Sequence, residues 1–151
     1  MVGDRLTDGV RIGQLLASEI SGNEGRLRDL ALADADPDVE PTPDGVLAYR
    51  IVRGDEGGEG TGAEGTSAGA EAADPVLVAE VYVHPDRARI EFVDDGDGDA
   101  DLPRVAAAAA DEAGLRVRPK AVRPPRTLVF VEDGAEVKRA LPVLEAVVDA
   151  L

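Results

Sequence analysis

The stretch LRVRPKAVRPPR, at residues 115–126, concentrates positive charge in an acidic chain. The whole sequence of 151 residues has 31 acids and 16 bases, giving a formal charge of −15. Guanidinium and ammonium groups bind phosphates and carboxylates through charge-assisted hydrogen bonds. The stretch therefore predicts a site for an anionic ligand or an acidic protein partner, with the following bases as candidates: Arg116, Arg118, Lys120, Arg123 and Arg126.

Two arrangements of this basic stretch are open. Side chains alternate along a strand, so Arg116 and Arg118 would share one face of a sheet, where Arg87 and Arg89 of a hairpin would join them. Alternatively, the five acids of residues 94–101 (DDGDGDAD) neutralise the stretch. Exposed ion pairs of that kind contribute only about 0–1 kcal/mol each. We favour neutralisation, which would make these bases structural.

Other residues whose side chains could bind a metal or take part in catalysis match no complete motif. Asp95, Asp97 and Asp99 have the spacing of the first half of a calcium-binding EF-hand loop, but its sixth and twelfth positions are Ala100 and Ala106. His84 is the single histidine, and the chain has no cysteine, so the usual zinc sites are excluded. We expect no metal and no cofactor, and we expect His84 to be a turn residue paired with a carboxylate.

The composition also limits the possible functions. Aromatic residues are 3% of the chain, so stacking platforms for nucleic-acid bases are scarce, and the charge of −15 repels phosphates. With 31 acids, no pair of carboxylates is identified as catalytic. We therefore expect a non-enzymatic binding or regulatory module. A nucleic-acid-binding protein is the first alternative, and an enzyme with carboxylate chemistry is the second.

The acidity indicates adaptation to salt. Molar salt shortens the range of charge repulsion to about 3 Å, so a chain with excess Asp and Glu and few Lys remains compact there. An acidic partner-binding protein is the competing interpretation of the same composition. No apolar run approaches the roughly 20 residues of a membrane span, and residues 1–20 do not resemble a signal peptide, so we expect a cytoplasmic location.

Hydrophobic periodicity predicts the elements that would position the bases. Residues 6–21 read as a helix capped by Asp4, with an apolar face of Leu6, Val10, Gly13, Ala17 and Ile20. Residues 27–33 favour a strand, and 46–53 a strand with Leu47, Tyr49 and Ile51 on one side. Residues 54–75 contain Gly, Ala and Glu with no large apolar side chain, and predict a disordered acidic loop.

The segment 76–93 predicts a hairpin with Pro85 and Asp86 in its turn. In that register three apolar pairs share one face: Val83 with Ala88, Val81 with Ile90, and Ala79 with Phe92. The other face pairs His84 with Arg87, Tyr82 with Arg89, and Glu80 with Glu91. A slip of one residue would exchange the two faces, so the pattern specifies the register.

The C-terminal third predicts two helices and two strands. Residues 102–113 form an Ala-rich helix with Asp101 as N-cap, and 115–118 and 127–131 form strands, the second in the centre of the sheet. The last helix begins at the Asp133–Glu136 capping box, and Pro142 predicts a kink or a late restart. Its expected apolar stripe is Val137, Leu141, Leu144, Val148 and Leu151.

This order of elements predicts a single α+β domain over residues 1–151, with acidic loops at 54–75 and 94–101. We expect a two-layer sandwich in which about three helices cover one face of a mainly antiparallel sheet of five to six strands. The other face would carry Tyr82, Arg87, Arg89, Arg116 and Arg118.

Several stretches together resemble a family of small acidic haloarchaeal proteins of unknown function. These are RLTDGVRIGQLLASEISG (5–22), ADADPDVEPTPDG (33–45), VYVHPDRARIEF (81–92) and LRVRPKAVRPPRTLVFVEDGAEVKRA (115–140). The resemblance covers nearly all of the chain outside the acidic loops. It implies a host that accumulates salt and a cytoplasmic location, and it implies no activity and no site residues.

Overall fold

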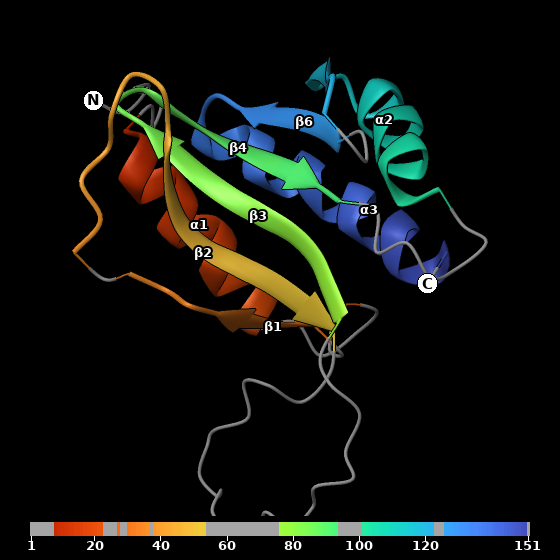
Figure 1. The fold of residues 1–151 in the computed structure, drawn as a ribbon, viewed down its shortest axis with the longest axis horizontal. Helices are drawn as coiled ribbons and strands as arrows, with labels where there is room; N and C mark the ends of the chain where they lie inside the picture. Colours follow the sequence, from red (N-terminus) through yellow and green to blue (C-terminus); the bar gives the residue numbers. More distant parts are fainter. Residues whose placement is uncertain are drawn as a thin grey trace, which may run out of the picture.

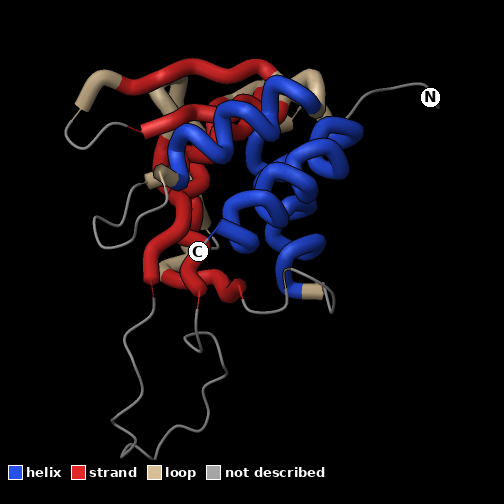
Figure 2. Tube along the Cα trace, turned by 90° about the vertical axis from the view of Figure 1, so that its right-hand side faces the viewer, coloured by secondary structure: helices blue, strands red, loops and turns tan. Residues whose placement is uncertain are grey.

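The computed structural model describes residues 8–22, 27, 30–36, 38–53, 76–93, 101–122 and 126–150. These residues form two layers, a sheet and a layer of helices on one of its faces (Figures 1 and 2). The helices are α1 (Gly9–Ser21), α2 (Leu102–Glu112) and α3 (Gly134–Ala150). The strands are β1 (Leu30–Ala33), β2 (Val46–Arg53), β3 (Val76–His84), β4 (Arg87–Phe92), β5 (Arg116–Lys120) and β6 (Arg126–Val131).

The sheet is antiparallel throughout, with the strand order β1-β2-β3-β4-β6-β5. The predicted α+β sandwich with helices on one face is therefore confirmed. β6 pairs with both β4 and β5, so it is an internal strand, as its continuous apolar run predicts, but it lies next to the edge strand and not at the centre of the sheet. After β4 the chain forms α2 and then β5, which lies at the outer edge of the sheet. The next strand, β6, returns between β4 and β5.

The register of the central hairpin is the predicted one. Ala79 lies opposite Phe92, Val81 opposite Ile90, and Val83 opposite Ala88. All six side chains are buried beneath the helices, where they form the middle of an aliphatic core. The second set, from Glu80–Glu91 to His84–Arg87, therefore points to the face without helices.

The predicted face of β2 needs one correction. Tyr49 and Ile51 are buried and lie opposite Val81 and Ala79, as expected. A β-bulge between Leu47 and Tyr49 places Leu47 opposite Tyr82, on the other face. A bulge adds one residue to one strand and so breaks the alternation that the sequence pattern assumes.

Helix α1 begins later and packs on a different stripe than predicted. Its N-cap is Asp8, whose Oδ1 accepts hydrogen bonds from the main-chain N–H groups of Val10 and Arg11, at 3.0 and 3.3 Å. The predicted cap, Asp4, lies outside the described residues. The buried stripe is Gly9, Ile12, Gly13, Leu16 and Ile20. Val10 and Ala17 of the predicted face are only half-buried. The apolar surface of α1 is thus wider than a single stripe.

Gly9 explains why α1 starts where it does. A Cβ atom at this position would lie 1.8 Å from the main-chain oxygen of His84 and 2.4 Å from that of Arg87. The Gly9 N–H donates to the Pro85 main-chain oxygen at 3.2 Å. The first turn of α1 therefore rests directly on the β3–β4 turn, a contact that only glycine permits.

The two C-terminal helices have the predicted caps. Asp101 Oδ1 accepts from the Arg104 N–H at 3.2 Å, and Gly114 follows α2 at a φ of 79°. Asp133 Oδ1 accepts from the Glu136 N–H at 3.0 Å, while Glu136 Oε1 accepts from Glu132 N–H at 2.8 Å, one residue earlier than the usual capping box.

Helix α3 runs through Pro142 without the late restart that we considered. Its buried residues are Val137, Ala140, Val143, Leu144 and Val147, so Leu141 and Val148 of the predicted stripe are at the margin of the core. Leu151 lies outside the described residues, as do residues 54–75 and 94–100. No described helix is long and apolar enough to cross a membrane.

Candidate functional site on the open face of the sheet

The helices cover one face of the sheet, and the opposite face is called the open face below (Figure 2). Most of the ion pairs between described residues lie on this open face. Strand pairing places its side chains in rows. One row runs Leu47, Tyr82, Arg89, Phe130, Arg116, and the next runs Ala33, Arg50, Glu80, Glu91, Leu128, Arg118. Lys120 and Arg126 pair at the end of β5 and β6, and His84 and Arg87 pair at the hairpin turn.

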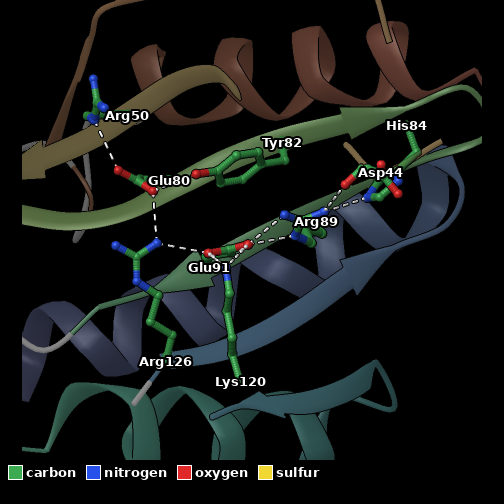
Figure 3. A network of polar contacts seen from close by, with 9 residues as sticks. All are labelled: Asp44, Arg50, Glu80, Tyr82, His84, Arg89, Glu91, Lys120 and Arg126. Atoms are coloured by element: carbon green, nitrogen blue, oxygen red, sulfur yellow. Dashed lines mark hydrogen bonds and ion pairs between the residues drawn. The ribbon is translucent and has the colours of Figure 1, made fainter. Parts of the chain in front are cut away.

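Two glutamates of like charge lie directly opposite each other at the centre of this face. Glu80 of β3 pairs with Glu91 of β4, an arrangement that is destabilising unless cations neutralise it. Arg126 lies between them: its Nη1 donates to Glu80 Oε1 at 3.0 Å and to Glu91 Oε1 at 2.8 Å (Figure 3). One guanidinium therefore joins both carboxylates and ties β6 to the central hairpin.

Three further bases complete a network around the two glutamates (Figure 3). Arg89 donates from Nε to Glu91 Oε2 at 2.8 Å, and Lys120 Nζ lies 3.3 Å from Glu91 Oε1. Arg50 donates from Nε to Glu80 Oε2 at 3.1 Å and from Nη1 to Asp34 Oδ2 at 2.6 Å. Five strands, β2 to β6, thus contribute side chains to one connected set of ion pairs.

Both glutamates are ionised although they are shielded from water. The side chain of Glu91 is fully buried and that of Glu80 is 9% exposed. Burial by itself raises the pKa of each carboxyl, but hydrogen bonds from Tyr82, Arg50 and Arg126 hold the pKa of Glu80 below its ordinary value. Arg126 and Arg89 do the same for the pKa of Glu91. The pair therefore lacks the protonated partner that acid–base catalysis by two carboxylates requires.

The two aromatic rings of the open face are already stacked against arginines. The guanidinium carbon of Arg89 lies 4.4 Å from the centre of the Tyr82 ring, and that of Arg87 lies 5.7 Å from the centre of the Phe130 ring. Tyr82 also donates its hydroxyl hydrogen to Glu80 Oε1 at 2.9 Å. Both rings thus serve the packing of the network.

His84 is buried and lies beside the network, where the structure differs from the expected contact with a carboxylate. Its Nε2 lies 2.9 Å from Arg89 Nη1, and its Nδ1 lies 3.0 Å from the main-chain oxygen of Pro43. Arg89 is always a donor, so Nε2 accepts and Nδ1 carries the hydrogen. Burial lowers the pKa of His84, and the charges of Arg87 and Arg89 lower it further. His84 is therefore a neutral connector.

The connector holds the loop that precedes β2. Arg89 Nη1 also donates to the main-chain oxygen of Asp44 at 3.0 Å. Gly45 has a φ of 91°, and a Cβ atom there would lie 2.4 Å from Arg89 Nη1 and 2.9 Å from the His84 ring. Glycine is required both for this backbone conformation and for the close approach.

The predicted basic residues divide into two groups. Lys120, Arg126 and Arg89 are engaged by the central glutamates, so the acids that neutralise them belong to the sheet itself. Arg87 pairs with Asp86 at 2.9 Å. Arg116 and Arg118 are exposed; Arg116 reaches Glu132 at 3.5 Å, and Arg118 forms no ion pair with another described residue. Arg123 and residues 94–100 lie outside the described residues.

Sequence reasoning did not identify the glutamates as the centre of the site. Glu80 and Glu91 were opposite each other in the predicted hairpin, and a like-charged pair in the middle of a sheet signals that cations must approach it. Arg50 carried no comparable signal, because its position depends on how β2 pairs with β3. Among the described residues no cluster of acidic or histidine side chains is arranged to hold a metal ion.

Comparison with known proteins gives a family for this chain. A family model described as "Family of unknown function (DUF7993)" matches residues 1–151. No curated protein and no solved structure matches the chain. The comparisons thus supply no activity, and the chemistry of the site rests on the side chains described above.

Replacing Arg126 with Met should destabilise the protein by about 2 kcal/mol, because the facing carboxylates of Glu80 and Glu91 lose their shared cation. Arg118→Met is the matched control and should change the free energy of unfolding by less than about 0.5 kcal/mol. Glu80→Gln should recover part of the loss in the Arg126→Met protein. Urea unfolding of the four proteins at pH 7 measures these effects, and equal stability of the two single Met variants would refute the bridging role of Arg126.

Stability should decrease as the pH falls through 6.5, because the lowered pKa of His84 means that the unfolded chain binds a proton that the folded protein resists. The slope cannot exceed about 1.4 kcal/mol per pH unit for one group. Urea unfolding at pH 7.5, 6.5 and 5.5 measures it, and His84→Gln should abolish the slope because the chain has no second histidine. A slope that persists in His84→Gln would assign the effect to other groups.

Proposed function

We propose that this chain, which belongs to the family of unknown function DUF7993, is a non-enzymatic binding module that engages an extended acidic segment of a protein partner along β5. Arg116 and Arg118 would form the ion pairs with the partner. The surface behind these two arginines would be formed by four further bases, which are not the first to contact the partner: Lys120, Arg126, Arg87 and Arg89.

The charge of the open face is the observation that carries this proposal. Although the chain has a formal charge of −15, the strand residues of this face include only two acids, both neutralised within the sheet. The bases of this face are Arg50, Arg87, Arg89, Arg116, Arg118, Lys120 and Arg126. A basic surface on an acidic protein favours anionic partners and orients their approach.

The position of β5 favours an extended partner. β5 is the outer strand of the sheet and pairs only with β6 among the described strands. An edge strand presents main-chain groups to which a further strand can hydrogen-bond. Arg116 and Arg118 are two residues apart and share one face, so they would meet carboxylates at alternate positions of an added strand.

The ion pairs behind β5 fix this edge in place. Lys120 contacts Glu91 from one end of β5, and Arg116 reaches Glu132 from the other. The strand is thus held against β6 before any partner arrives, which reduces the ordering cost of binding.

The alternatives receive less support from the same face. Single-stranded nucleic acids bind proteins by stacking bases on aromatic rings, but the Tyr82 and Phe130 rings already stack against Arg89 and Arg87. An enzyme using two carboxylates needs one with a raised pKa, whereas the pKa values of Glu80 and Glu91 are both lowered.

A peptide of alternating Thr and Glu should bind the protein, with an affinity that falls as KCl increases. Arg116→Glu/Arg118→Glu should abolish binding, because two attractive charges become repulsive. Arg104→Glu/Arg139→Glu places the same charge change on α2 and α3 and should leave binding intact. Fluorescence anisotropy with the labelled peptide measures this, and an oligothymidylate of equal length tests the nucleic-acid alternative. Equal loss in both double variants, or tighter binding of the oligothymidylate, would overturn the proposal.

We also propose that the protein works in the cytoplasm of a cell that accumulates salt. The excess of 31 acids over 16 bases supports this, because self-repulsion of such a chain is relieved only when salt screens it. The buried ion pairs of Glu91 are screened much less than exposed charges, so the central network would persist at high salt.

Raising KCl from 0.1 to 2 M should therefore increase the midpoint of thermal unfolding. NaCl at equal ionic strength should act in the same way if screening is the cause. Calorimetry in both salts checks this, with sucrose at equal osmolality as the uncharged control. A midpoint that is independent of salt would argue against adaptation to a salt-rich cell.

A further inference from the structure

A half-enclosed cavity of about 310 Å³ lies on the opposite side of β2 from the central network. Its walls come from three places: α1, the loop that follows β1, and the strands β1, β2 and β3. Val10, Ala17, Leu32, Val39, Ala48 and Val83 provide most of its apolar surface. Ligand sites in proteins commonly begin at this size and have this kind of lining.

The cavity explains the second apolar stripe of α1. Ile12, Leu16 and Ile20 fill the core, whereas Val10, Gly13 and Ala17 line the cavity. Three wall positions carry alanine, where larger apolar residues would fill the space: Ala17, Ala35 and Ala48. The apolar wall is open to water at the mouth, so a ligand that covers it gains free energy from burying that apolar surface.

The one charged side chain among the described lining residues of the cavity is the carboxylate of Asp36. Tyr49 lines it, but its hydroxyl already donates to the Gly13 main-chain oxygen at 2.8 Å. Asp36 and Gln14 also line it and both are exposed, which places their polar groups at the mouth. No Lys or Arg is among the described lining residues. An apolar interior with a carboxylate at its mouth complements an apolar ligand that ends in a cation.

The wall that carries Asp36 is tied to the sheet. The Asp36 N–H donates to the Ala48 main-chain oxygen at 2.9 Å, and Asp36 Oδ1 accepts from the Asp38 N–H at 2.9 Å. At the far end of the same loop, His84 and Arg89 hold the main-chain oxygens of Pro43 and Asp44. The mouth is therefore pre-formed, which favours binding of a small molecule.

We infer that this cavity binds a small aliphatic amine, with the hydrocarbon chain between α1 and β2 and the ammonium group at Asp36. The cavity is separate from the basic edge at β5. It would bind a cationic ligand, whereas the edge would bind an anionic partner. It adds a small-molecule site to a protein whose open face we assign to an acidic partner.

Octylamine, 1-octanol and octanoate test this inference, since they share a hydrocarbon chain and differ in charge. Titrations followed by ¹H–¹⁵N NMR at 0.5 M KCl should shift the Gln14 side-chain amide and the Ala17, Val39 and Ala48 main-chain amides. Octylamine should bind about fivefold more tightly than octanol, as expected for one exposed ion pair, and octanoate should bind most weakly. No binding of any probe, or shifts located elsewhere, would overturn the inference.

Two variants separate the cavity from its charge. Asp36→Asn keeps the acceptor for the Asp38 N–H but should make octylamine and octanol bind equally, while the neighbouring Asp38→Asn should preserve the difference. Ala17→Phe fills the cavity and should weaken octylamine binding by about tenfold or more. Ala108→Phe on the exposed surface of α2 is its control. Retained binding in Ala17→Phe, or an unchanged preference in Asp36→Asn, would contradict the site.

Discussion

The structure depends on the ion pairs that surround two glutamates on neighbouring strands. Glu80 and Glu91 face each other at the centre of the sheet, and a pair of buried like charges is unfavourable unless cations reach both. Arg126 bridges them, and Arg50, Arg89 and Lys120 complete the set. These bases come from four strands, so neutralising the pair also links β2, β5 and β6 to the central hairpin of β3 and β4. The same requirement engages Lys120 and Arg126 of the basic stretch and leaves Arg116 and Arg118 exposed.

The open face thus carries two groups of bases: those that stabilise the fold and those that we propose to contact a partner. Bases near the glutamates serve the fold, because each has a carboxylate within hydrogen-bonding distance and limited exposure. Arg116 and Arg118 of the edge strand have long exposed side chains, one with a weak partner and the other with no ion pair among the described residues. An acidic protein with a basic edge repels most anions at a distance and attracts those that approach the edge. This edge is the surface to which we propose that an acidic partner binds.

The two sites that we propose are connected through one loop. The segment between β1 and β2 supplies Asp36 and Val39 to the cavity, and its Pro43 and Asp44 oxygens are held by His84 and Arg89. Arg89 in turn pairs with Glu91 in the network. A chain of direct contacts therefore leads from the cavity wall to the centre of the open face. His84, the one side chain with an ordinary pKa near neutrality, lies in this series of contacts in its neutral form.

The sequence alone determined the α+β class, the antiparallel hairpin with its register, and the caps at Asp101 and Asp133. These features depend on local periodicity and on contacts between residues close in the chain. It also identified the bases of the candidate site, with the exception of Arg50. Tertiary structure decided which acids they meet, because Glu80 and Glu91 lie 46 and 35 residues from Arg126 along the chain. Tertiary structure also decided which face of the sheet carries Leu47, because a bulge in β2 shifts the register there. It decided that the second apolar stripe of α1 lines the cavity, because the loop after β1 packs beside that stripe. Pairings over such separations depend on strand order, which no local pattern encodes.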